Sequence, residues 1–130
     1  MTTILIVDDE HNTRIGLVKM LCQDGYKTES VANGIEALEY LDEKTVDLVI
    51  TDINMPKMNG FVFVRKLNQY YPHIKVIMMT ACIEEDYDLK LADLGVFECL
   101  HKPFKMENLR TIIQKTLTQP FSLRGSNFVP

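Results

Sequence analysis

The chain has 130 residues, of which 46% are hydrophobic and 25% are charged, and its formal net charge at pH 7 is -4. This length fits one domain, and the composition is that of a globular protein and too apolar for general disorder. The negative charge gives no electrostatic reason to expect nucleic acid or an anionic membrane as a direct partner.

The first part of the chain alternates short apolar runs with amphipathic stretches. Residues 4–7 predict a buried strand that ends in acidic residues, and 26–31 predict a shorter and more polar edge strand. Apolar residues at three- and four-residue spacing predict a helix over 12–24, and Gly25 ends it. The predicted apolar face of this helix consists of Ile15, Val18, Leu21 and Cys22.

The stretch 46–60 is the one around which the chain is organised. It follows a helix predicted over 34–42 with Asn33 as the N-cap. Its apolar run 48–50 is typical of a parallel strand covered on both faces, and a proline and a glycine later break regular structure. Asp52 therefore stands at the carboxyl end of a buried strand.

The rest of the chain continues the alternation. A helix is predicted over 61–71, a strand over 76–79, a weaker helix over 84–94, a strand over 97–101 and a helix over 106–118.

Five successive βα units predict the α/β class, with right-handed crossovers and helices on both faces of a parallel sheet. At this length the commonest arrangement is a flavodoxin-like (βα)5 doubly wound parallel five-stranded sheet with strand order 2-1-3-4-5. Residues 1–119 would form this domain, and 120–130 would be a C-terminal tail or the start of a linker.

Polar residues end the central strands, and the predicted strand order brings them to one crevice. Singly, each has an ordinary explanation as a helix cap, a turn residue or a solvated charge. Together, the carboxylates would repel one another unless a cation lay among them, and Mg²⁺, with Mn²⁺ as an alternative, suits oxygen ligands. These residues are Asp8, Asp9, Asp52, Thr80 and Lys102.

A carboxylate beside a divalent cation, a hydroxyl and an ammonium is suited to phosphoryl transfer onto aspartate. Asp52 would be the nucleophile. Lys102 and the metal would neutralise charge on the phosphoryl oxygens, and the Thr80 hydroxyl and the backbone N–H of Ala81 would donate hydrogen bonds to them. A carboxylate is already ionised at neutral pH, so no general base is required.

Four runs carry a family resemblance, and they stand in one order on the predicted βα units. They are Ile-Leu-Ile-Val-Asp8-Asp9-Glu10, Asp52-Ile-Asn-Met-Pro56 with Gly60, Thr80-Ala81, and Lys102-Pro103-Phe104. Together they resemble the receiver domain of two-component response regulators, and the resemblance covers residues 3 to about 118.

The resemblance implies a phosphorylation switch. Asp52 would be the phosphoacceptor. Asp9, Asp52 and the main-chain carbonyl of Asn54 would bind Mg²⁺ directly, and Asp8 would assist through water. The donor would be a phosphohistidine of a sensor histidine kinase or of a histidine phosphotransfer protein, and the chain would act as a signalling module and not as an enzyme.

The resemblance also assigns residues that respond to the phosphoryl group. Thr80 and Lys102 would sense it, and the bond between Lys102 and Pro103 would be cis. One position departs from the family. Receivers commonly carry an aromatic residue three positions before this lysine, and here that position is Cys99, which cannot fill the same volume.

Output is expected on the surface formed by the predicted elements 84–94, 97–101 and 106–118. Leu100 and His101 are the candidate contact residues on its strand. The partner would be an output protein or domain, and a homodimer formed on phosphorylation is a further candidate.

Two other functions remain open. A phosphatase with an aspartyl-phosphate intermediate, as in dehalogenase-like enzymes, usually needs a second acid two residues after the nucleophile, where this chain has Asn54. A degenerate receiver that serves only as a docking module is favoured by Cys99 alone.

The cysteines and the N-terminus bear on location. Cys22, Cys82 and Cys99 lack metal-type spacing and predict buried reduced thiols and a cytoplasmic protein. No apolar run approaches the roughly 18 to 20 residues needed to span a bilayer, and the N-terminus lacks a signal-peptide pattern. We therefore expect no membrane insertion and no secretion.

Overall fold

The computed structural model describes residues 1–81 and 93–119. In this part of the chain, parallel strands form one five-stranded sheet in the order β2-β1-β3-β4-β5. The predicted α/β class and strand order 2-1-3-4-5 are confirmed. The strands are β1 (Thr3–Val7), β2 (Lys27–Val31), β3 (Leu48–Asp52), β4 (Lys75–Thr80) and β5 (Glu98–His101).

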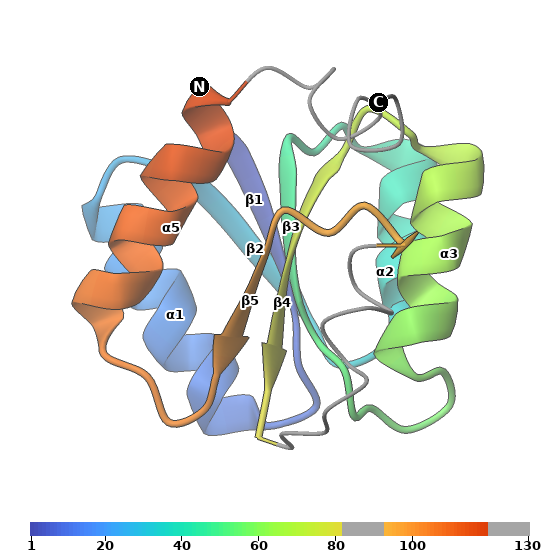
Figure 1. The fold of residues 1–130 in the computed structure, drawn as a ribbon, viewed down its shortest axis with the longest axis horizontal. Helices are drawn as coiled ribbons and strands as arrows, with labels where there is room; N and C mark the ends of the chain where they lie inside the picture. Colours follow the sequence, from blue (N-terminus) through green and yellow to red (C-terminus); the bar gives the residue numbers. More distant parts are fainter. Residues whose placement is uncertain (82–92, 120–130) are drawn as a thin grey trace.

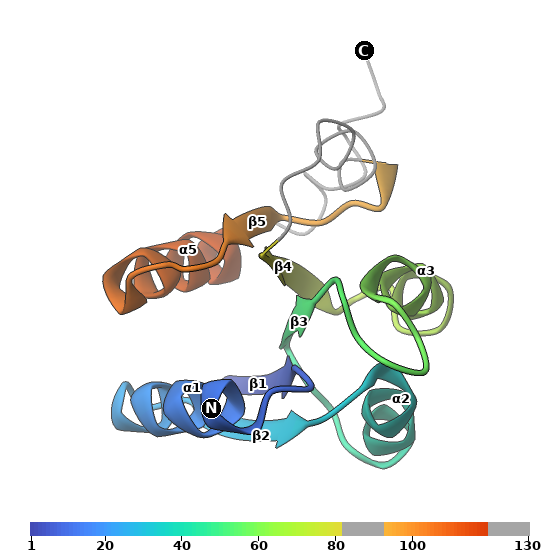
Figure 2. The ribbon, with the colours of Figure 1, turned by 90° about the horizontal axis from the view of Figure 1, so that it is seen from below.

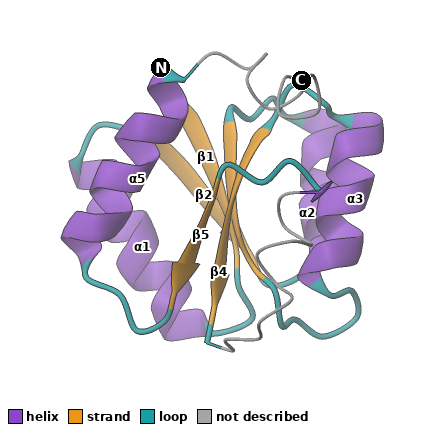
Figure 3. Ribbon diagram, viewed as in Figure 1, coloured by secondary structure: helices purple, strands orange, loops and turns teal. Residues whose placement is uncertain are grey.

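Helices cover both faces of the sheet. α1 (His11–Gln23) and α5 (Met106–Thr118) lie on one face, and α2 (Gly34–Glu43) and α3 (Gly60–Tyr70) lie on the other (Figures 1 and 2). Figure 3 shows the strands as the layer between them. Most of the helix predicted over 84–94 and the whole predicted tail 120–130 fall outside the described residues. None of the described helices has the length and apolar character to cross a membrane.

Alternate residues of the central strands supply two separate cores. Ile4 and Ile6 pack toward α1 and α5, whereas Leu5 and Val7 pack toward α2 and α3. Every residue of β3 is buried. The continuous apolar runs in the sequence therefore follow from strands that are covered on both faces.

The buried face of α1 differs from the one predicted. Leu17, Met20 and Leu21 are buried, whereas Ile15 is 53% exposed and Cys22 is also exposed. The prediction that Cys22 is a buried thiol is therefore wrong. The apolar residues of α1 can be grouped into two overlapping stripes at helical spacing. The stripe with Leu17 and Met20 packs on the sheet, and the stripe with Ile15 and Cys22 does not.

The local signals for helix ends are confirmed. The Asn33 side chain accepts a hydrogen bond from Glu36 N at 3.0 Å, as expected of an N-cap for α2. Gly25, which follows the C-cap residue Asp24 of α1, has a φ of 96°, a conformation that glycine adopts at little cost.

Gly60 allows the start of α3 to pack closely against the end of β3. Its N–H donates to Ile53 O at 2.7 Å. A Cβ atom at this position would lie 2.5 Å from the Asp52 carbonyl oxygen and 2.7 Å from Ile53 Cα. Only glycine fits between these backbone atoms, so Gly60 fixes the geometry of the chain that carries Asp52.

The substitution Gly60→Ala should lower the free energy of unfolding by about 1–3 kcal/mol, because overpacked backbone must move apart. Urea denaturation measures this loss. Gly16→Ala is the matched control, because a Cβ there meets nothing within 4 Å among the described residues. That control should raise the unfolding free energy by up to about 1 kcal/mol through helix propensity. Equal effects of the two variants would contradict the close packing.

Lys75 holds the carboxyl end of α5. Its ammonium donates to the carbonyl oxygens of Thr116 at 2.9 Å and Gln119 at 2.5 Å, and it lies 5.5 Å from the centre of the Phe97 ring. The last carbonyl groups of a helix have no partner within the helix, and a cation there also interacts favourably with the helix dipole. Lys75 thus ties α5 to the start of β4.

The substitution Lys75→Met should lower the free energy of unfolding by about 1.5–3 kcal/mol, the range for hydrogen bonds that involve a charged group. Thermal and urea unfolding measure the loss. Lys19→Met removes the same charge from an exposed site on α1 and should change stability by less than about 0.5 kcal/mol. A loss no larger than that of the control would rule out a net contribution from Lys75.

Candidate functional site

The carboxyl ends of β1, β3 and β5 bring three predicted site residues together. Asp8 follows β1, Asp52 ends β3, and Lys102 follows β5. Each continues the set of alternate residues that faces α1 and α5 on its own strand, as Ile6 and Ile50 do. Their side chains therefore converge on one side of the sheet.

Lys102 bridges the two carboxylates. Its Nζ lies 2.9 Å from Asp8 Oδ2 and 2.9 Å from Asp52 Oδ2. Asp8 has no exposed surface and Asp52 is only 7% exposed. Buried carboxylates are stable in charged form only when they are paired and hydrogen-bonded. Lys102 is thus a cation among the acidic residues.

The two carboxylates also act on Lys102. Burial by itself would lower the pKa of the Lys102 ammonium, but its hydrogen bonds to Asp8 and Asp52 and their negative charge outweigh this effect and raise the pKa. Lys102 is therefore fully charged at neutral pH.

Backbone groups fix both carboxylates. Glu10 N donates to Asp8 Oδ1 at 2.9 Å, and Asn54 N donates to Asp52 Oδ1 at 3.1 Å. Each carboxylate therefore uses one oxygen for the backbone and the other for Lys102. Their positions are set before any ligand binds.

Arg14 makes contacts near the site that the sequence did not predict. Its Nη1 donates to the main-chain oxygen of Asp8 at 2.7 Å, and its Nη2 lies 3.4 Å from His11 Nδ1. The hydrogen bond to Asp8 holds the turn with Asp8 and Asp9 against α1. The sequence does place Arg14 one helical turn after Glu10, at the start of the helix that follows the acidic residues. That position could have indicated a contact with the acidic turn.

Asp9 completes an acidic cluster. One carboxylate oxygen from each of Asp8, Asp9 and Asp52 lies within 4.8 Å of the others, and Asp9 is exposed. Carboxylate oxygens at this spacing are the ligands that Mg²⁺ accepts, and the exposed side leaves room for water and phosphate oxygens. The residues present therefore fit a hard divalent cation.

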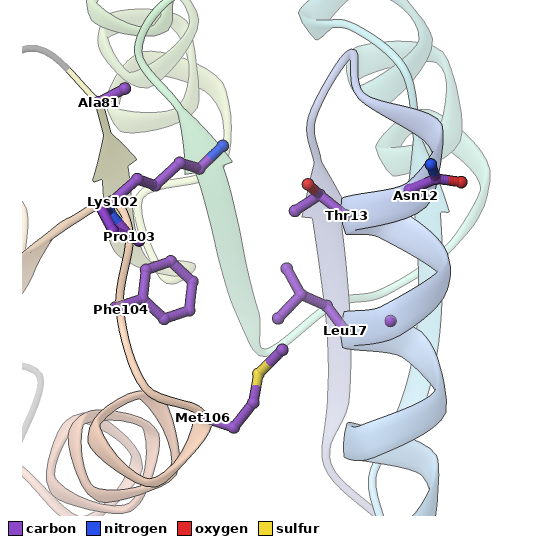
Figure 4. Close-up of a pocket in the computed structure, with 9 residues that line it drawn as sticks. Asn12, Thr13, Leu17, Ala81, Lys102, Pro103, Phe104 and Met106 are labelled. Carbon is purple, nitrogen blue, oxygen red and sulfur yellow. The ribbon is translucent and has the colours of Figure 1, made fainter.

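Thr80 and Ala81 lie at the adjacent strand end. Thr80 is fully buried at the end of β4, and its carbonyl oxygen accepts a hydrogen bond from Lys102 N at 2.7 Å. Ala81 is exposed. Together with Lys102 it lines a cavity between α1 and the segment after β5 (Figure 4). The Lys102–Pro103 peptide bond is cis, as the resemblance implies.

The strand β5 gives one correction. Leu100 was a predicted surface contact, but it is only 8% exposed and packs into the core beside α1 and α5. The prediction placed two successive residues of a strand, Leu100 and His101, on one surface, whereas successive side chains of a strand point to opposite faces. His101 is exposed, and Cys99 is half-buried against the core on the side of α2 and α3.

Sequence comparison identifies relatives of this arrangement. A model of the response regulator receiver domain family matches residues 4–114. The chain is 35% identical to the sporulation initiation phosphotransferase F of Bacillus subtilis, over 88% of this chain and 92% of that protein. It is 36% identical to the sensor kinase CckA of Brucella abortus, of which it spans only 12%.

Structure comparison agrees with these matches. The chemotaxis response regulator CheY4 of Vibrio cholerae superposes with a TM-score of 0.84 at 32% identity, covering 90% of this chain and 99% of that one. The response regulator TrrA of Thermotoga maritima, solved in complex with Mg²⁺ and BeF, superposes with a TM-score of 0.81 at 33% identity, covering 90% and 100%. On sequence and on fold, this chain belongs to the response regulator receiver domain family of two-component signalling.

Proposed function

We propose that Asp52 accepts a phosphoryl group from a phosphohistidine at a Mg²⁺ site built by Asp8, Asp9, Asp52 and the main-chain carbonyl of Asn54. The observation that carries this proposal is the Lys102 ammonium, 2.9 Å from both Asp8 and Asp52, beside the exposed carboxylate of Asp9. A nucleophile, a fixed cation and open ligand positions lie together at one strand end.

Each residue has a distinct part in the transfer. An Asp52 carboxylate oxygen attacks phosphorus, the bond from phosphorus to the donor's imidazole nitrogen breaks, and its electron pair stays on that nitrogen. Lys102 neutralises charge on the transferred group, and the Thr80 hydroxyl and Ala81 N–H donate hydrogen bonds to its oxygens. When bound, Mg²⁺, with Mn²⁺ as the alternative, supplies further charge neutralisation.

We also propose that the chain is a stoichiometric acceptor and not an enzyme that turns over phosphomonoesters. Asn54 supports this view, because a carboxamide two residues after Asp52 supplies no general acid. The hydrolase alternative would need a second acid at that position.

The donor would be a sensor histidine kinase or a histidine phosphotransfer protein, and phosphorylation would change a protein-interaction surface. The exposed side of α5 and His101 are the described parts of that surface. Its partner would be an output protein or domain, or a second copy of this chain. We place the exchange in the cytoplasm, where the exposed thiol of Cys22 would remain reduced.

Acetyl phosphate with Mg²⁺ tests the acceptor directly. The protein should gain one hydroxylamine-labile phosphoryl group by intact-mass spectrometry, and Asp52→Asn should gain none. Asp47→Asn is the control, because Asp47 precedes β3 at the opposite end of the strand and accepts from Thr3 N at 2.8 Å. Labelling of Asp52→Asn equal to that of the unmodified protein would refute the assignment. Sustained release of phosphate from varied phosphomonoesters would favour the hydrolase.

The metal assignment is tested by isothermal titration with Mg²⁺. Asp9→Ala should abolish measurable binding, because it removes the exposed ligand of the cluster. Lys102→Met should tighten binding, because the ammonium no longer competes for the oxygens of Asp8 and Asp52.

Glu39→Ala is the control for lost negative charge, since Glu39 is exposed on α2. It should leave Mg²⁺ affinity as it is in the unmodified protein. Unchanged affinity in Asp9→Ala would show that the ligands lie elsewhere.

A further inference from the structure

The loop between β3 and α3 contains a strained turn. Lys57 has a φ of 69°, and among the described residues it is the one residue other than glycine with a positive φ. The N–H of Met58 donates to Pro56 O at 2.7 Å and closes a three-residue turn around Lys57. Turns of this kind are rare and strained, and such a backbone persists only where its surroundings hold it. A contact within the loop must therefore hold this turn.

Met58 makes such a contact with the start of α2. A Cβ atom on Gly34 would lie 3.0 Å from Met58 Sδ and 3.3 Å from Phe63 Cδ1. Gly34 is buried and is not among the residues with positive φ, so the close approach of Met58 favours glycine there. Figure 2 shows the loop beside α2. The half-buried Met58 side chain thus anchors the strained turn on a neighbouring helix.

The same loop carries a group of the proposed metal site. Asn54 N donates to Asp52 Oδ1 at 3.1 Å, and the main-chain carbonyl of Asn54 is the proposed Mg²⁺ ligand. Backbone hydrogen bonds fix both ends of the loop, from Ile53 N to Met79 O at 3.1 Å and from Gly60 N to Ile53 O at 2.7 Å. A displacement of the strained turn would therefore be absorbed by the short segment between these ends, which includes Asn54.

Met58 does not reach the metal site itself. Its side chain packs with the core on the side of α2 and α3, whereas the side chains of Asp8 and Asp52 face α1 and α5. Any effect of Met58 on the site must therefore pass through the backbone of the loop. A loop that is held in place before the metal arrives loses less conformational freedom on binding.

We propose that Met58 is a positioning residue for the Mg²⁺ site: its packing on Gly34 holds the strained turn at Lys57 and, through the loop, the carbonyl of Asn54. The inference rests on the proposed function and names a residue outside the site that sets its affinity for the metal.

The test is isothermal titration of Met58→Ala with Mg²⁺, in the full chain. Without the anchor the turn can relax, so the dissociation constant for Mg²⁺ should rise by about tenfold, the lower end of the range for residues that support metal ligands. Met58→Leu keeps an apolar side chain of similar volume and should bind Mg²⁺ within about twofold of the unmodified protein.

Second substitutions at Lys57 show whether backbone strain is the cause. Asparagine tolerates a positive φ better than alanine does. Lys57→Asn, combined with Met58→Ala, should therefore restore most of the lost affinity, because the turn no longer needs an anchor. Lys57→Ala in the same background removes the same charge but keeps the strain, so it should restore much less.

Met20→Ala is the control for a general loss of stability. Met20 is 7% exposed and packs in the core on the side of α1 and α5. Its truncation should lower the free energy of unfolding in urea at least as much as Met58→Ala does, because Met20 is the more deeply buried residue. The dissociation constant for Mg²⁺ should nevertheless stay as it is in the unmodified protein.

The outcomes are distinguishable from failure of the proposed function. An unchanged dissociation constant in Met58→Ala, an equal loss in Met20→Ala, or a recovery no larger with Lys57→Asn than with Lys57→Ala would each overturn the inference while Asp52 remained the acceptor. Failure of the unmodified protein to bind Mg²⁺, or of acetyl phosphate to label Asp52, would instead refute the proposed function and this inference with it.

Discussion

The ion pairs of Lys102 with Asp8 and Asp52 are the interaction on which the site depends. The two carboxylates are buried, and without the ammonium at 2.9 Å from each of them their charges would face one another in a region with little water. The three residues come from the ends of β1, β3 and β5, which are far apart in the sequence. The charges of the site therefore balance only when β1, β3 and β5 are assembled in one sheet.

Close backbone contacts hold the described part of the scaffold below the site. Gly60 brings α3 against the backbone of Asp52, and Arg14 holds the backbone of Asp8. Asp9 is the exposed member of the acidic cluster. The nucleophile is therefore held in place from below, while the acidic cluster remains accessible through Asp9.

Position 99 departs from the pattern common in this family. Cys99 stands where receivers commonly carry an aromatic side chain, and it is half-buried against the core of α2 and α3. Phe97, the nearest aromatic residue on that segment, lies 5.5 Å from the Lys75 ammonium, near the end of α5. Cys99 is paired with Met78 of β4, two residues before the buried Thr80, so a small side chain occupies the position where the family commonly has a ring.

The sequence by itself determined the order of the elements and the residues that end the strands. Both follow from local patterns: apolar runs such as 48–50 at buried strands, and caps such as Asn33 and Gly25 at helix ends. The tertiary structure decided the rest. It made Lys102 the partner of two carboxylates, required glycine at position 60, and left Ile15 and Cys22 exposed and Leu100 buried. These outcomes depend on which surfaces meet across the sheet, and residues distant in sequence carry no local signal of that contact.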